Sequence, residues 1–486
     1  MISRWVEEEM ETVDLQHKRR STRVKQLVSD LAAMPAASIP AAVGGGRAET
    51  EAAYRFFDNP NVEFDAILAP HRDSTLKRIR QYETVIITQD TSELDLTRPE
   101  EQVEGAGPLD SGSRRGCFIH PLLALTPDGV PLGTLSTECW TRDEPDLVKP
   151  DKALRERERK QTPIEDKESL RWVTGLKETH KIAALVPGTK VIGVADSEAD
   201  IYELIVAGQN SEEEGAPCAD WLVRASQDRA LRRNAAEADA ARSILEAVTA
   251  TSALTTYEVA VRGREPKVGC ETRGRRQARE SRQALVEVRA CAVTLRGPYR
   301  PDRKLPDVTV NVVLVQEINP PAGEEPISWL LLTSLPISTT AEVLSVIQTY
   351  SQRWSIEVFF RVLKQGCRIE WRRFEKQERV ERFLAIALIV SWRTLYVTRL
   401  GRECPDLNCE AVFEVSEWKS VYQVTQKKTP PKTPPKLQEF VRMVAQLGGY
   451  VNRPRADEPG AETIWKGLQR TYDIANCWEL FGPGKK

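Results

Sequence analysis

Patterns typical of β-strands are concentrated in the middle of this 486-residue chain, and helical patterns flank them on both sides. ETVIITQD is a short apolar run that ends on Asp90, and KVIGVAD is another that ends on Asp196. CFIHPLLALTPDGVPLGTLS predicts two strands joined by a turn at residues 126–129, because Pro-Asp-Gly favours a tight turn between apolar segments. WLVRAS, at residues 221–226, predicts a further buried strand. Together these patterns predict an α/β protein with a mixed sheet flanked by helices.

The strand patterns continue to about residue 335, and helices follow them. Alternating runs such as YEVAVRG and VTVNVVLVQEI predict a β subdomain inserted at about residues 230–335. From residue 338, AEVLSVIQTYSQRWSIEVFFRVLKQG predicts one long helix, and ERFLAIALIVSWRTLYV predicts another. The Lys/Pro-rich linker KKTPPKTPPK, at residues 427–436, precedes a final helical unit at about residues 437–480.

Because the chain is longer than one hydrophobic core usually serves, we expect several domains. Residues 1–70 contain two short helical patterns around the break PAASIPAAVGGG, and the first pattern begins with QHKRRSTRVK, which holds five cations and no acid. A small DNA-binding domain and an ordinary solvated helix face explain this pattern about equally well. We expect the mixed core at residues 71–375 and a helical C-terminal domain at residues 376–486.

The net charge of the chain is -2, so no global excess of cations marks a polyanionic partner. Local charge differs from this average. Residues 262–304 carry 13 Lys and Arg against 5 Asp and Glu, while residues 16–25 and 427–436 hold five and four cations without an acid. Any affinity for nucleic acid should therefore come from patches and should fall as salt rises.

The terminal and apolar segments predict a cytosolic protein without a membrane partner. The N-terminus, MISRWVEEEMETVD, is too acidic for a signal peptide, and the apolar run FLAIALIV is too short to span a bilayer. The nine Cys are irregularly spaced and form no CxxC motif, so we expect reduced thiols. The four His are scattered, which makes carboxylates better candidates for organising hydrolytic chemistry.

Three carboxylates stand where the fold could bring them together: Asp90 and Asp196 at strand ends, and Glu357 on the long helix. Mg²⁺ takes oxygen ligands, and two-metal phosphoryl transfer uses carboxylates that clamp two ions about 3.5–4 Å apart. Because clustered carboxylates repel one another without cations, their convergence would itself imply metal. Taken singly, however, a strand-end Asp is more often a turn or cap residue, and a helical Glu usually pairs with a Lys or Arg.

The segment around Glu357 carries a more specific pattern. At about 100° per residue, Tyr350, Arg353, Glu357 and Lys364 fall within an arc of roughly 60° on the predicted long helix. Such a face would suit a scissile phosphate, since the cations can hold phosphate oxygens while the carboxylate holds metal. A surface ladder of ion pairs would give the same pattern, although the aromatic residues around it favour a partly buried helix.

The segment YSQRWSIEVFFRVLKQG resembles the Y-x2-R-x3-E-x6-K signature of the DDE transposases of the insertion-sequence-four family. Further segments resemble the family in the expected order: EAAYRFFDNPNV, ITQDTSEL, VIGVADSEADIY and INPPAGEEPISWLLLTS. The resemblance extends from about residue 15 to 390, with a weaker likeness at QLGGYVNRP and around Trp465 in the tail.

This resemblance implies a ribonuclease-H-like catalytic core in which Asp90, Asp196 and Glu357 bind two Mg²⁺ ions, with Mn²⁺ able to substitute. The implied activity is cut-and-paste transposition: nicking of the transposon end, hairpin formation and opening, and strand transfer into target DNA by a homodimer on paired ends. Four further residues would hold the terminal phosphates, the hairpin and a flipped base: Tyr350, Arg353, Lys364 and Trp329. From its pattern alone, Trp329 is at least as well explained by packing in the β subdomain.

The resemblance also assigns the two ends of the chain. The N-terminal helices would recognise transposon-end DNA through Lys18, Arg19, Arg20, Arg23, Tyr54 and Arg55. The C-terminal domain would dimerise, although the linker at residues 427–436 has no counterpart in the family pattern. The expected location is the bacterial cytoplasm, in association with the nucleoid.

Two other functions share many of these features. A regulator or inhibitor derived from a transposase would hold end DNA or a partner protomer without cutting, but the intact acids and N-terminal unit argue against it. A ribonuclease-H-like nuclease would share the metal site and would not join DNA to a target. Cleavage of the cognate end DNA, as opposed to binding alone, separates the first alternative from a transposase.

Overall fold

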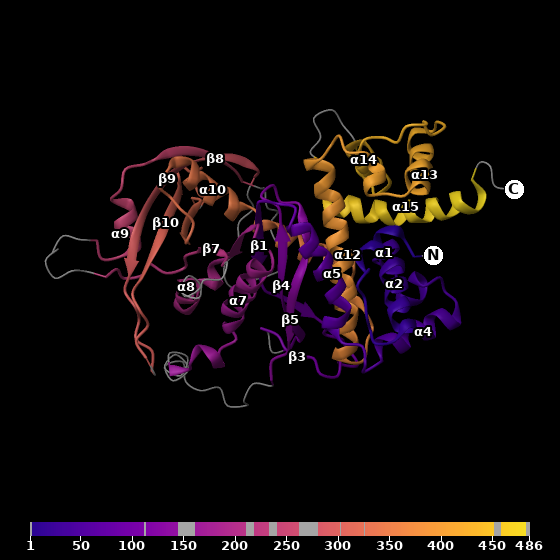
Figure 1. Cartoon of the computed structure of the whole chain (residues 1–486), viewed down its shortest axis with the longest axis horizontal. Helices are drawn as coiled ribbons and strands as arrows, with labels where there is room; N and C mark the ends of the chain where they lie inside the picture. The colour runs from indigo at the N-terminus through magenta and orange to yellow at the C-terminus, as the bar shows by residue number, and fades with distance from the viewer. Residues whose placement is uncertain are drawn as a thin grey trace. The chain divides into compact units, whose positions relative to one another are not determined.

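A computed structural model describes residues 2–110, 113–143, 161–209, 218–232, 241–261, 280–301, 303–324, 326–451 and 458–482. The chain divides into two compact units, called here the first unit (Met1–Lys149 with Trp354–Lys486) and the second unit (Pro150–Arg353). Much of the basic stretch predicted at residues 262–304 lies outside the described residues. Figure 1 shows the helices and strands of both units.

Five helices open the first unit: α1 (Arg4–Glu9), α2 (Lys18–Ala33), α3 (Ile39–Ala42), α4 (Arg47–Phe57) and α5 (Phe64–Ile79). Helix α2 begins after His17, whose side chain accepts a hydrogen bond from the backbone N–H of Arg19 at 3.2 Å. Gly44 and Gly45 have φ angles of 89° and 74°, a conformation that glycine adopts without strain, and they separate α3 from α4. The structure confirms helices on both sides of the predicted Gly-rich break and adds α1 and α3 to them.

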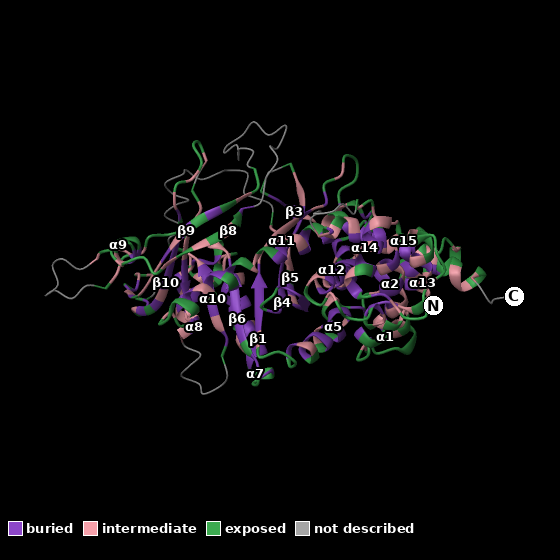
Figure 2. Cartoon of the chain, turned by 90° about the horizontal axis from the view of Figure 1, so that it is seen from above, coloured by how far each residue is buried: buried purple, intermediate pink, exposed green. Residues whose placement is uncertain are grey.

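A small antiparallel sheet follows, made of β1 (Thr84–Gln89), β2 (Ser92–Asp95), β3 (Gly107–Pro108), β4 (Arg115–Leu125) and β5 (Pro131–Trp140). Strand β4 pairs with the other four strands. The predicted turn between β4 and β5 is confirmed, because the N–H of Gly129, at φ 85°, donates to the carbonyl of Thr126 at 2.9 Å. Strands β1 and β4 are largely buried (Figure 2).

The rest of the first unit is helical, with α11 (Trp354–Arg361), α12 (Gln377–Glu403), α13 (Val415–Gln426), α14 (Leu437–Leu447) and α15 (Ala461–Phe481). Helix α12 packs against α5, β5 and α2 (Figure 1). By length and composition it could cross a membrane, yet most of its apolar stretch is buried inside the structure, as in the core helix of a folded domain. The linker at residues 427–436 joins α13 to α14.

The second unit contains a mixed sheet of six strands: β6 (Lys190–Ala195), β7 (Asp220–Arg224), β8 (Thr255–Val261), β9 (Arg282–Leu295), β10 (Val308–Glu317) and β11 (Ser328–Thr333). Their order is β6-β7-β11-β10-β9-β8; β6 and β7 are parallel, and the other pairs are antiparallel. The strands of the predicted insertion therefore continue the same sheet through the β7–β11 pair.

Helices α7 (Leu170–Leu185), α8 (Tyr202–Gln209), α9 (Ile244–Thr249) and α10 (Thr340–Ser351) accompany this sheet. Its apolar core includes the fully buried Trp172, Tyr202 and Trp221. Helix α8 approaches Trp221 closely at Gly208, where a Cβ atom would lie 2.4 Å from the indole nitrogen. A mixed sheet flanked by helices, with helical segments at both ends of the chain, is the α/β architecture that the sequence predicts.

The prediction of one uninterrupted helix from residue 338 is wrong. Helix α10 ends at Ser351 and α11 begins at Trp354. Between them, the N–H groups of Gln352 and Arg353 donate to carbonyls three residues earlier, at 3.2 and 3.1 Å. After Arg361 the chain widens into a π-helical turn over Val362–Gly366. Tyr350 therefore lies on α10, Glu357 on α11 and Lys364 in the π-helical turn, so the four predicted side chains are spread over separate helical segments.

Candidate functional site

Asp90 directly follows the buried strand β1, and its Oδ1 atom accepts a hydrogen bond from the N–H of Thr91 at 2.7 Å. The hydroxyl of Thr91 lies 2.9 Å from Nδ1 of His120, and Nε2 of His120 lies 3.0 Å from Oε1 of Gln89. This pattern assigns the imidazole proton to Nε2, since the Gln89 oxygen can only accept. Hydrogen bonds between His120 on β4 and both Gln89 and Thr91 therefore fix the end of β1, directly before and after the candidate acid Asp90.

Sequence reasoning missed His120, because the four His are scattered along the chain and no shared motif marks any of them. The signal that could have found it is local. His120 interrupts the apolar run FIHPLLAL of a buried strand, where an imidazole needs polar partners.

Asp196 directly follows β6 and caps the short 3-10 helix Ser197–Ala199. Its Oδ1 atom accepts from the N–H of Glu198 at 2.8 Å. The carboxylate thus has the local capping role that is common for an aspartate at a strand end. Such a role engages one oxygen and holds the carboxylate at the end of the strand.

Asp200, four residues further on, has a structural role instead. It is buried, and its Oδ2 accepts from the N–H groups of Ser226 and Gln227 at 2.8 and 3.0 Å. Its Oδ1 accepts from Arg229, at 2.6 Å from Nη2 and 3.1 Å from Nε. Both oxygens are therefore committed to the loop after β7, which leaves Asp196 as the candidate among the two aspartates of the segment ADSEAD.

Around Tyr350, the second unit gathers several of the predicted groups. The rings of Trp329 and Tyr350 meet edge to face, with centroids 5.6 Å apart. Burial raises the pKa of the Tyr350 phenol, Asp196 adds to this rise, and Arg353 and Arg224 oppose it. Those charges therefore act on the phenol from nearby, and a phenol with a raised pKa stays protonated at neutral pH. This neighbourhood can donate hydrogen bonds to an anion and can hold it with guanidinium groups.

Glu357 and Lys364 lie in different local structures of the first unit. Glu357 is half-buried in the first turn of α11, and Lys364 lies in the π-helical turn. The Nζ atom of Lys364 is 3.6 Å from Oε1 of Glu370, which also accepts from the N–H of Asp95 at 3.0 Å. Lys364 thus has an acidic partner, Glu370, that sequence reasoning did not identify.

The donor chemistry of the three candidate acids fits Mg²⁺, which prefers carboxylate and other oxygen ligands. Asp90 and Glu357 belong to the first unit and Asp196 to the second. In the part of the chain that the structure describes, no group of three His, Cys, Asp or Glu is gathered closely enough to hold a metal ion.

The predicted DNA-binding residues of the N-terminus lie on two helices, with Lys18, Arg19, Arg20 and Arg23 on α2 and Tyr54 and Arg55 on α4. Lys18, Arg19, Tyr54 and Arg55 are exposed, while the apolar side of α2 is buried. Helix α2 begins with three consecutive cations and has no acid in its first turn. Cations are unfavourable at the positive end of a helix dipole, so this arrangement destabilises the isolated helix and suits an anionic partner.

Three family models match the chain. Residues 2–62 match a transposase DNA-binding domain, residues 214–393 match a transposase DDE domain, and residues 389–477 match the Tn5 transposase dimerisation domain. The fold and these matches define the chain as a DDE transposase with a ribonuclease-H-like core. Its set of domains identifies it as a DNA transposase. More particularly, it resembles the Tn5 transposase.

The matches cover the predicted residues unequally. The DDE match contains Trp329, Tyr350, Arg353, Glu357 and Lys364 and leaves out both aspartates. The DNA-binding match contains all six predicted N-terminal residues.

The chain is also similar to a solved structure titled "Cryo-EM structure of piggyBac transposase synaptic complex with hairpin DNA (SNHP)". The identity is 9% and the TM-score 0.36, over 100% of this chain and 79% of the other.

Proposed function

We propose that this chain catalyses cut-and-paste DNA transposition, with Asp90, Asp196 and Glu357 as its metal-binding catalytic acids. The observation that carries the proposal is the order of the three transposase matches on a chain whose strands β1 and β6 are each followed directly by an aspartate. The reaction sequence is nicking of the transposon end, hairpin formation, hairpin opening and strand transfer into target DNA.

The three carboxylates would hold divalent metal, with Mg²⁺ as the expected ion and Mn²⁺ as a substitute. When bound, such ions neutralise charge on the phosphate and generate the attacking oxygen nucleophile. The ends of β1 and β6 would position Asp90 and Asp196, and the first turn of α11 would position Glu357.

The groups around Tyr350 would position the DNA phosphate. The protonated phenol donates one hydrogen bond, and the planar guanidinium of Arg353 offers two parallel donors that match phosphate oxygens. Lys364 adds a point charge, while Trp329 supports the Tyr350 ring and offers an aromatic face near a flipped base. These side chains would therefore bind the DNA and orient its phosphate.

The ends of the chain would supply recognition and assembly. The cations that begin α2, together with Tyr54 and Arg55 on α4, would contact transposon-end DNA. The match to a dimerisation domain supports a homodimer that pairs two transposon ends before they are joined to target DNA. The setting of this activity would be nucleoid DNA in the cytoplasm of a bacterium.

Cleavage of a duplex that carries the inverted repeat beside the coding region tests the proposal. With Mg²⁺, the purified protein should produce nicks and hairpins on this duplex. Asp90→Ala, Asp196→Ala and Glu357→Ala should each abolish both products while a mobility shift of the same duplex persists. Glu198→Ala is the matched control, since this exposed acid lies two residues after Asp196 and pairs with Arg171 at 3.0 Å. Retained cleavage in any of the three variants would overturn the assignment.

The alternative is a transposase-derived regulator that binds DNA without cutting it. A mobility shift with no cleavage by the wild-type protein, across Mg²⁺ and Mn²⁺, would favour that function. A nuclease without strand transfer would cleave the duplex and would not join it to a target plasmid.

A further inference from the structure

A pocket of about 370 Å³ in the first unit lies between two stretches of chain that the catalytic proposal does not use. One stretch is residues 36–40 together with Tyr54, and the other is residues 368–374. Three arginines line this pocket, and none of the lining residues is acidic. The pocket is therefore strongly cationic for its size.

The indole of Trp371 is 78% exposed beside this pocket. The surrounding segment is nevertheless held firmly, because Ile369, Arg372 and Phe374 are buried. The guanidinium of Arg372 donates to the carbonyls of Cys367 and Pro35, at 2.6 and 2.5 Å, and also to that of Ala37. A large aromatic side chain that is exposed to solvent although its neighbours in the chain are buried is typical of an interaction site.

The arginines at this surface lack acidic partners. Arg368 and Arg373 are exposed, and neither forms an ion pair with any residue that the structure describes. Burial lowers the pKa of the nearby Arg98, and repulsion from Arg373 lowers it further, against a smaller opposing effect of Glu101 and Glu375. The positive charges of Arg98 and Arg373 therefore repel each other at this surface, and a bound polyanion would reduce this repulsion.

The backbone of Arg368 adds an independent observation. Its φ and ψ angles are 51° and 42°, in the left-handed region that residues other than glycine seldom occupy. A glycine would adopt these angles without strain. Strained positions of this kind cluster at binding and catalytic sites, where a particular side chain is needed.

We propose that Arg368, Trp371 and Arg373, with Tyr54 at the edge of the pocket, form a DNA site that binds an unpaired nucleotide next to duplex. The two guanidiniums would hold phosphate oxygens, and the exposed indole would stack on the base. A paired base offers no free face for such stacking, which is why the unpaired nucleotide is the expected ligand. This inference rests on the proposed DNA transposase function. It uses Tyr54, already proposed to contact transposon-end DNA, and adds Arg368, Trp371 and Arg373 as binding groups.

Fluorescence anisotropy with two probes tests the site in the full-length protein. One probe is a fully paired duplex of mixed sequence, and the other is the same duplex with a single-stranded thymidine tail. Trp371→Ala should weaken binding of the tailed duplex about tenfold and change binding of the paired duplex little, because the variant cannot stack on a base. Trp371→Phe should retain most of the affinity.

The arginines have a separate signature in salt dependence. Arg373→Ala should weaken binding of both probes and reduce the slope of log affinity against log salt by about 0.9 for each phosphate that the variant no longer neutralises. Arg368→Gly should bind DNA as weakly as Arg368→Ala while its thermal unfolding temperature equals or exceeds that of the wild type, because glycine relieves the backbone strain. Lys181→Ala is the control, as this exposed lysine pairs with Glu178 at 3.0 Å.

Unchanged affinities and salt slopes in all variants would overturn the inference. A shift in dimerisation with unchanged DNA affinity in Trp371→Ala, seen by light scattering, would overturn it as well and would make this surface a protein-binding one. Wild-type cleavage of the end duplex is scored in parallel, so that failure of the transposase proposal is distinguished from failure of this site alone.

Discussion

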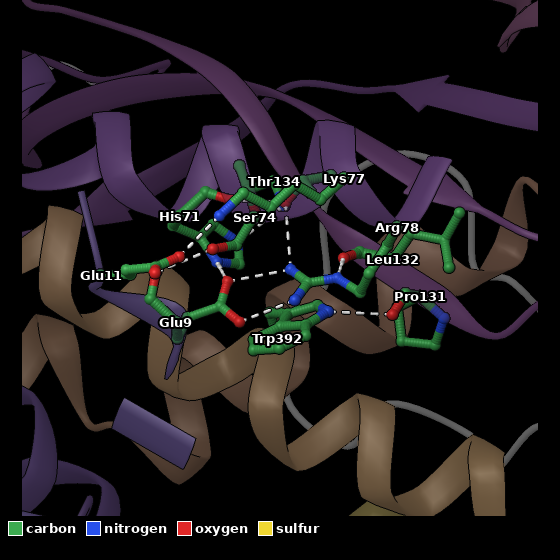
Figure 3. Close-up of polar contacts among 11 residues, drawn as sticks. Glu9, Glu11, His71, Ser74, Lys77, Arg78, Pro131, Leu132, Thr134 and Trp392 are labelled. Atoms are coloured by element: carbon green, nitrogen blue, oxygen red, sulfur yellow. Dashed lines mark hydrogen bonds and ion pairs between the residues drawn. The ribbon is translucent and has the colours of Figure 1, made fainter. Parts of the chain in front are cut away.

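The Nδ1 atom of His71 lies 2.5 Å from Oε1 of Glu9, and this contact joins helix α5 to helix α1 inside the first unit (Figure 3). The backbone N–H of Thr134 donates to Nε2 of the same ring at 2.9 Å. Nε2 is therefore an acceptor, and the imidazole proton resides on Nδ1 and points to Glu9. Burial lowers the pKa of His71, so the contact is a hydrogen bond from a neutral ring to a carboxylate.

The ionic partner of Glu9 is Arg78, which binds both carboxylate oxygens at 2.7 and 2.9 Å. The same guanidinium donates to the carbonyl of Leu132 at 2.6 Å and lies over the ring of Trp392, 4.4 Å from its centroid. Figure 3 shows these groups converging. One buried network therefore ties α1 to the sheet and to the core helix α12.

Replacement of Glu9 by Gln should destabilise the protein by about 3 kcal/mol, because Arg78 would lose its buried counter-charge. Urea denaturation followed by circular dichroism measures the shift in midpoint. Glu11→Gln is the control: Glu11 pairs with Lys77 at 2.7 Å on the surface, where solvent screens the charges, so its replacement should shift the midpoint far less. Equal effects of the two substitutions would contradict the importance of the buried network.

Acid should destabilise the first unit in two stages. The folded His71 has a pKa below its ordinary value of 6.5, so the unfolded chain binds more protons and stability declines as pH falls below 6.5. For Glu9, burial raises the pKa, but His71 and Arg78 outweigh burial and lower it from 4.5 to about 2. The stability from Glu9 is thus complete above pH 4.5 and is lost as pH falls toward 2.

His71→Asn removes the first stage, since an amide can donate to Glu9 without titrating. Thermal unfolding between pH 7 and pH 5 should therefore decline less steeply in this variant than in the wild type. An equal decline in both proteins would assign the acid sensitivity to other groups.

The features that the sequence predicted correctly depend on neighbouring residues. A short apolar run followed by a polar turn is enough to end β1 before Asp90 and β6 before Asp196. The features that it missed depend on distant partners or on small departures from helical geometry. Glu9 and His71 lie on different helices and meet only in the folded chain, and nothing local to Gln352 and Arg353 marks the end of α10.

Asp196 and Asp200 should separate in their effects on stability and activity. Asp200→Ala should cost about 3 kcal/mol, because it leaves Arg229 without its buried partner and frees the loop after β7. Asp196→Ala removes a single capping bond and should cost about 1 kcal/mol while abolishing cleavage. Differential scanning calorimetry and a cleavage assay on the same samples test this contrast. A folded, stable Asp196→Ala protein that still cleaves would exclude this acid from the metal site.

Tyr350→Phe should isolate the contribution of the phenol hydroxyl. The ring contact with Trp329, at 5.6 Å between centroids, is retained in this variant, so unfolding should change by less than about 1 kcal/mol. The rate of hairpin formation should fall about tenfold, as expected when one hydrogen bond to a charged phosphate oxygen is removed. Single-turnover cleavage with saturating protein measures this rate without a contribution from DNA affinity.

Trp329→Phe serves as the comparison, because it keeps an aromatic edge against Tyr350 and leaves the phenol in place. A full rate in Tyr350→Phe would show that the buried hydroxyl does not touch the phosphate, and the role of Tyr350 would then be limited to packing against Trp329.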